Sequence, residues 1–82
     1  MRLSVVTLGK LADIFTLPEI ELVGADSITM LDLRNRIGPP HSSLLFSPKN
    51  RIAVNGLVTA YDPELVLADG DEVAFLPPVS GG

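Results

Sequence analysis

The chain has 82 residues, and 46% of them are hydrophobic, which is enough for one domain with a small core. Ten acidic residues against six Lys and Arg give a net charge of −4, which argues against a nucleic-acid partner because phosphates are bound by a basic face. Cysteine is absent, which excludes disulfides and thiolate chemistry and fits a reducing cytoplasm. No apolar run approaches the ~20 residues of a membrane span, and the N-terminus has no signal-peptide pattern. We therefore expect a cytoplasmic protein without a nucleic-acid or membrane partner.

Catalytic side chains are few. The one histidine, His41, lies in the loop-like segment GPPHSS and is expected to be exposed. The sequence contains none of the motifs HExxH, GxSxG, Walker A or GxGxxG. No nucleophile or acid–base group with supporting partners emerges from these residues. The sequence therefore favours a chain that does not catalyse a reaction alone, and it predicts no metal site.

The first half of the chain predicts two strands and two helices. RLSVVTL (2–8) is β-branched and mostly apolar on both faces, as expected of a central strand. KLADIF (10–15) predicts a short helix, and EIELV (19–23) alternates acidic and aliphatic residues like an edge strand. The main helix is expected to follow Asp26 or Ser27, either of which can cap it. Its apolar stripe consists of Ile28, Leu31, Leu33 and Ile37.

The second half predicts a hairpin and a last strand. The segment 38–50 begins with Gly-Pro-Pro, which ends the main helix after about three turns. The rest of that segment contains one helical turn, and we assign it no role. RIAVNGLVTA (51–60) predicts a hairpin, because Asn55-Gly56 supplies the positive φ angles of a tight turn. EVAFLP (72–77) predicts the last strand.

The order of these elements predicts a two-layer α+β domain. An antiparallel pair, a helix that crosses one sheet face and later strands added to the same sheet form the β-grasp, or ubiquitin-like roll. In that arrangement a mixed sheet packs on one main helix. We expect the domain to span residues 1–76 and residues 77–82 to form a flexible, extended C-terminal tail.

The last strand predicts a partner surface beside the tail. Because side chains alternate along a strand, Val73 and Phe75 are expected in the core, and Leu76 is expected on the opposite face. If Leu57 of the hairpin and Val79 of the tail join Leu76, they form an apolar patch suited to a partner.

The tail itself has the composition of a segment that enters another protein's active site. Pro77 and Pro78 have no N–H, so they end the strand ladder and favour an extended backbone. Gly81 and Gly82 carry no side chains and fit a narrow channel. A carboxylate is attacked only after its oxygen becomes a leaving group, for instance in an acyl-adenylate made from ATP. The tail is therefore predicted to be a substrate for a partner enzyme.

The segment DGDEVAFLPPVSGG (69–82) closely resembles the C-terminus of the small subunit of molybdopterin synthase, in the MoaD/ThiS group of ubiquitin-like sulfur carriers. KLAD (10–13) and AVNG (53–56) agree with that resemblance. It implies that an E1-like adenylyltransferase uses ATP to activate the C-terminal carboxylate, which a sulfur donor protein then helps convert to a thiocarboxylate. The small subunit inserts this tail into the large, catalytic subunit of a heterotetramer, where the sulfur passes to cyclic pyranopterin monophosphate. No cofactor is implied on this chain itself.

The resemblance also implies roles for single residues. Gly82 carries the sulfur, and Gly81 permits access to it. The inserted segment comprises Pro77, Pro78, Val79 and Ser80. Leu57 and Leu76 are implied at the partner interface. Leu76 stands where relatives often have a second aromatic residue, and Ser80 where they often have threonine.

Three alternatives remain open from the sequence. A thiamine-pathway sulfur carrier shares the fold and the Gly-Gly end, although such chains are typically shorter and lack the Pro-Pro. A ubiquitin-like modifier would instead be joined through Gly82 to a lysine of a target. A plain interaction module would have an idle tail, and deleting Gly81-Gly82 would leave its activity intact.

Overall fold

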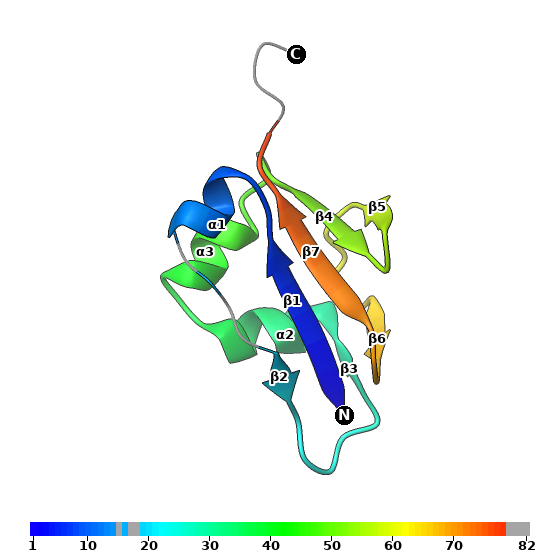
Figure 1. Cartoon of the computed structure of the whole chain (residues 1–82). Helices are drawn as coiled ribbons and strands as arrows, with labels where there is room; N and C mark the ends of the chain where they lie inside the picture. Colours follow the sequence, from blue (N-terminus) through cyan, green and yellow to red (C-terminus); the bar gives the residue numbers. More distant parts are fainter. Residues whose placement is uncertain (15, 17–18, 79–82) are drawn as a thin grey trace.

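Two sheets and three helices make up the computed structural model of the chain, which describes residues 1–14, 16 and 19–78 (Figure 1). The larger sheet has the strand order β2-β1-β7-β4-β5. Its members in chain order are β1 (Arg2–Thr7), β2 (Ile20–Glu21), β4 (Arg51–Val54), β5 (Leu57–Thr59) and β7 (Glu72–Leu76). The central pair, β1 and β7, is parallel, and the other pairs are antiparallel. The sheet is therefore mixed, as the sequence predicted.

The core lies on the face of this sheet that the helices cover (Figure 1). Leu3 and Val5 of β1 and Val73 and Phe75 of β7 project into it, and the two β7 side chains are fully buried. The alternation predicted for EVAFLP is thus confirmed. Phe46 packs edge-to-face on Phe75, with ring centroids 5.0 Å apart.

The main helix, α2 (Met30–Ile37), begins later than the sequence predicted. Residues 27–29 instead form β3 (Ser27–Thr29), which pairs with β6 (Val66–Ala68) in a second, two-stranded sheet. The N-cap is consequently Thr29, and not Asp26 or Ser27. The expectation of a longer helix was wrong because pairing with β6 keeps these residues extended.

Thr29 and Asp32 form a capping box at the start of α2. The Thr29 hydroxyl accepts the Asp32 N–H at 3.1 Å, and the Asp32 carboxylate accepts the Thr29 N–H at 3.0 Å. The Thr29 N–H bond to the carboxylate, and after it the Thr29 side chain, hold the pKa of Asp32 below its ordinary value. Met30 and Leu33 are fully buried, whereas Leu31, predicted in the apolar stripe, is 44% exposed. The helix has eight residues, so it makes about two turns rather than three.

Two short helices complete the fold, α1 (Lys10–Ile14) and α3 (His41–Leu45). Gly38 ends α2 at φ 71°, with its N–H bonded to the Arg34 carbonyl, as the Gly-Pro-Pro stop predicted. No helix in the described part of the chain is long and apolar enough to cross a membrane.

Candidate functional site

The tail leaves the domain from the middle of the sheet, because β7 lies between β1 and β4 (Figure 1). Its last residue, Leu76, is paired with Arg51 of β4. On the other side, the Leu8 N–H donates to the Phe75 carbonyl at 3.0 Å and extends the contact with β1. The root of the tail is therefore held from both sides. Pro77 follows half-buried, and Pro78 is exposed.

Gly9 provides the seat on which Pro77 rests. A Cβ built on Gly9 would lie 2.9 Å from Cγ of Pro77 and 3.4 Å from its Cδ. Gly9 also has φ +57°, in the region that disfavours side chains. The site therefore needs a glycine for both reasons. Sequence reasoning missed this residue, although a glycine directly after a central strand marks a sharp turn at that point.

The sheet face opposite the helices is apolar beside this root. Paired residues share a face, so Val6, Ala74, Ala53 and Val58 form one row across four strands. Leu76 projects from the same face, two positions beyond Ala74, and is half-buried. We call these five residues the outer-face row; the sequence predicted Leu76 on this face, and the register confirms it.

Leu57 does not belong to the outer-face row, which corrects the expectation that it joins Leu76 in one patch. It pairs with Val54, whose side chain packs on the core cluster, so both project from the helix-covered face. Leu57 is 76% exposed there because it lies at the hairpin end of the sheet edge. Along the ladder it is three positions, about 10 Å, from the level of Leu76. Val58 occupies the outer-face position instead.

Hydrogen bonds fix the other end of β7. The Asn55 side chain donates to the Asp71 carboxylate at 2.9 Å and accepts the Glu72 N–H at 2.9 Å. The Ala68 N–H donates to the same carboxylate at 2.8 Å. Together these bonds, that of Ala68 first and that of Asn55 second, hold the pKa of Asp71 below its ordinary value. The hairpin turn is thereby tied to the start of the strand that carries the tail.

The remaining predicted site residues, Val79, Ser80, Gly81 and Gly82, lie outside the described residues. Within the described residues, no three His, Cys, Asp or Glu side chains are grouped as a metal ion needs. His41 is exposed at the start of α3. What this arrangement offers chemically is a held tail root beside an apolar sheet face.

Comparison with known proteins now identifies the relatives of this chain. The profile of the ThiS family matches residues 5–82. The chain belongs to the ThiS family of ubiquitin-like sulfur carriers. This match begins within β1 and continues through the C-terminal tail, so the family is shown for nearly all of the domain and for the tail together.

Two solved structures share the β-grasp fold. The thiamine biosynthesis protein ThiS from Geobacter metallireducens is 21% identical, with a TM-score of 0.64. SAMP1 from Haloferax volcanii is 22% identical, with a TM-score of 0.70. Each comparison covers 100% of both chains. At this identity they establish the fold alone, and no curated protein sequence matches this chain.

Proposed function

We propose that this ThiS-family chain is the sulfur-carrying small subunit of molybdopterin synthase. An E1-like adenylyltransferase joins the Gly82 carboxylate to AMP from ATP and releases pyrophosphate. Sulfur that a donor protein delivers as sulfide then attacks the acyl carbon, so the bond to AMP breaks, AMP leaves and a thiocarboxylate remains. The large subunit supplies the active site in which this sulfur passes to cyclic pyranopterin monophosphate. In this scheme the chain itself binds no cofactor, and the reactions take place in the reducing cytoplasm.

The observation that supports the proposal most strongly is the root of the tail. β7 ends between β1 and β4, and Pro77 rests on Gly9 at that point. A tail that starts from a fixed position and then contains Pro78, Gly81 and Gly82 loses little entropy when a partner grips it. In this proposal Val79 and Ser80, together with the two prolines, occupy the partner's channel.

The outer-face row is the proposed contact surface for these partners. Val58 is 59% exposed and Leu76 is half-buried, so an apolar partner surface would remove both from water. Leu76 adjoins the tail, so a partner that grips residues 77–82 also covers it. In this proposal Leu57, on the opposite face, contributes at most at the edge of the interface.

The destination of the sulfur rests on the resemblance of residues 69–82 to molybdopterin synthase small subunits. A thiamine-pathway carrier is the second candidate, because one similar structure is a thiamine biosynthesis protein. A modifier that joins Gly82 to lysine uses the same activation and differs only in the attacking group, which is an amine rather than sulfur.

Intact-mass spectrometry of the chain tests the proposal directly. The chain is incubated with the purified E1-like enzyme, ATP and a sulfur donor of its source organism, and we expect the mass gain of one oxygen replaced by sulfur. Deleting Gly82 should abolish this gain and change the free energy of unfolding by less than about 0.5 kcal/mol, because a terminal glycine has no side chain to contribute to a core.

Two acceptor assays then decide the destination. The loaded chain is mixed with cyclic pyranopterin monophosphate and the large subunit, or with the thiazole-forming enzyme. Molybdopterin in the first assay supports the proposal, and thiazole alone would assign the chain to the thiamine pathway. ATP-dependent attachment to lysines without any sulfur gain would make the chain a modifier.

A further inference from the structure

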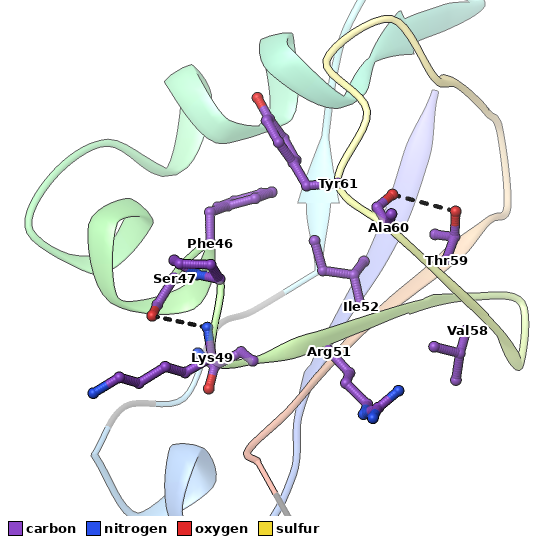
Figure 2. A pocket seen from close by; sticks show the side chains of 11 residues that line it. Phe46, Ser47, Lys49, Arg51, Ile52, Val58, Thr59, Ala60 and Tyr61 are labelled. Carbon is purple, nitrogen blue, oxygen red and sulfur yellow. Dashed lines mark hydrogen bonds between the residues drawn. The ribbon is translucent and has the colours of Figure 1, made fainter.

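A depression of about 540 Å³ lies where the β4–β5 ladder ends (Figure 2). Phe46, Ile52 and Tyr61 form its apolar wall, and Val58 lies at its edge. Phe46 and Tyr61 contact each other edge-to-face, with ring centroids 5.3 Å apart. One side of the depression comes from segment 38–50, to which the sequence assigned no role.

Positive charge gathers around this depression in an otherwise acidic chain. Lys49 and Arg51 line it and are exposed. The Arg34 guanidinium lies behind the wall, 5.3 Å from the ring centroid of Phe46 and 5.3 Å from that of Tyr61. These three residues are half of the six Lys and Arg in the chain.

The positive charge is not neutralised within the described residues. The ion pairs there join Arg2 to Glu19 and Glu21, at the opposite edge of the sheet. The Lys49 ammonium and the Arg51 guanidinium lie on two different sides of the rim of the depression and point away from its apolar wall (Figure 2). That combination matches a ligand with both a carboxylate and an apolar group.

The depression also lies close to the tail and to a sheet edge. Arg51 is paired with Leu76, the last residue before the tail. β5 is the edge strand, and the outward N–H and C=O groups of an edge strand can pair with an extended segment. A partner that grips the tail therefore has the depression within its footprint.

We infer that this depression is the docking site for an acidic, partly apolar peptide segment of the enzyme that activates the tail. One acidic side chain of that segment pairs with Lys49 and a second with Arg51, because the two cations point to different sides (Figure 2). An aliphatic or aromatic side chain between them packs on the exposed part of Tyr61. Because the net charge of −4 repels acidic segments elsewhere, the local positive charge fixes where the segment binds. The identity of the partner rests on the proposed function, whereas the chemistry of the segment rests on the depression itself.

NMR titration of the ¹⁵N-labelled full chain tests the docking site without any partner enzyme. The probe is the capped peptide acetyl-ELELF-amide, and its neutral counterpart is acetyl-QLQLF-amide. With the acidic peptide we expect chemical-shift changes confined to residues 46–52 and 58–61. The neutral peptide, or the acidic peptide at high salt, should bind at least about tenfold more weakly. Scattered or absent changes with millimolar acidic peptide, or equal changes with both peptides, would overturn the inference.

Charge reversal supplies the matched variants. Lys49→Glu combined with Arg51→Glu should weaken binding of the acidic peptide at least about tenfold. Lys10→Glu combined with Arg36→Glu, at two exposed residues outside the depression, makes the same change in net charge and should leave binding unaltered. Unaltered binding by the double variant would refute the site. Concentration-dependent shifts at the same residues without peptide would show that a second copy occupies it instead.

Activation kinetics with the purified E1-like enzyme separate this inference from the proposed function. The double variant should raise KM for the chain about tenfold and leave kcat unchanged, since the tail is intact. If wild-type chain is activated and the double variant has the same KM, the docking site is wrong and the function stands. If wild-type chain is not activated, the proposed function fails, and the peptide titration still decides the docking site.

Discussion

Gly9 and Pro77 show how one missing side chain sets the position of the tail. The two residues are far apart in sequence and meet because β1 and β7 are parallel neighbours. Pro77 cannot donate a hydrogen bond to a ladder, so packing on Gly9 is what holds it after the strand ends. At the residue scale, hydrogen bonds hold the strand up to Leu76, and a packing contact holds Pro77 after it.

We predict that Gly9→Ala lowers the free energy of unfolding by about 2 kcal/mol, through the close contact with Pro77 and the positive φ angle. Urea denaturation measures the change. Gly24→Ala is the control, since Gly24 has φ +81° and nothing within 4 Å of an added Cβ. Adding Pro77→Ala to Gly9→Ala should restore the part of the free energy of unfolding that was lost through the close contact with Pro77. An equal loss in Gly24→Ala, or no recovery in the double variant, would contradict the role of Gly9 as a seat.

At the scale of elements, the bonds among Asn55, Ala68 and Asp71 join three segments that the chain brings together only on folding. The β4–β5 turn, the end of β6 and the start of β7 meet at one carboxylate. Ionised Asp71 accepts these bonds better than the neutral acid does, so folding favours its ionised form.

This carboxylate predicts a pH dependence of stability. Because its pKa is lower in the folded state, the stabilisation is complete above the ordinary Asp pKa and is lost as pH falls through the folded-state pKa. Asp71→Ala should therefore lower the free energy of unfolding by about 1 kcal/mol at pH 7 and by less at pH 2.5. Urea denaturation at both pH values checks this. Asp26→Ala, which removes an exposed carboxylate outside the network, is the control. A loss of free energy of unfolding of the same size at both pH values in Asp71→Ala would contradict a role for the ionised form of this carboxylate.

The elements also show which parts of the fold the sequence can predict. The hairpin and the last strand depend on local signals, Asn55-Gly56 and the alternation around Phe75, and both are confirmed. The start of α2 was predicted too early because the partner of β3 lies far along the chain, in β6. Local capping signals at Asp26 and Ser27 could not reveal that pairing.

The candidate site also has a part that the sequence can predict and a part that it cannot. The face of Leu57 could have been read from the sequence, since a two-residue turn makes it pair with Val54. The contact of Gly9 with Pro77 and the charged depression at Arg51 could not, because both depend on the order of strands in the finished sheet.

On the scale of the whole molecule, the two sheet faces have different tasks. One face is covered by helices and forms the core, and the other presents the outer-face row next to the tail. If that row is the partner surface, substitutions on the two faces should differ in their effect even where both residues are exposed leucines or valines.

We predict that Leu76→Asp weakens the proposed complex with the large subunit about tenfold or more, because it replaces an apolar side chain by a carboxylate that must lose its hydration in an apolar contact. Leu57→Asp, from the same kind of residue on the opposite face, should change affinity less than about threefold. Isothermal titration calorimetry gives both dissociation constants, and thermal unfolding verifies that both variants are folded. Equal effects of the two substitutions would remove the outer-face row from the interface.

The parallel pairing of β1 with β7 has a mechanical consequence. The start of β1 and the end of β7 lie at opposite ends of this ladder (Figure 1). A partner that pulls on the tail while the N-terminal end is restrained therefore slides the two strands lengthwise, and their evenly spaced hydrogen bonds share the load. Force applied through Pro77 would not open these bonds one at a time, as it does when a hairpin is unzipped. The parallel pair of β1 and β7 therefore resists tension that is applied lengthwise through the end of β7.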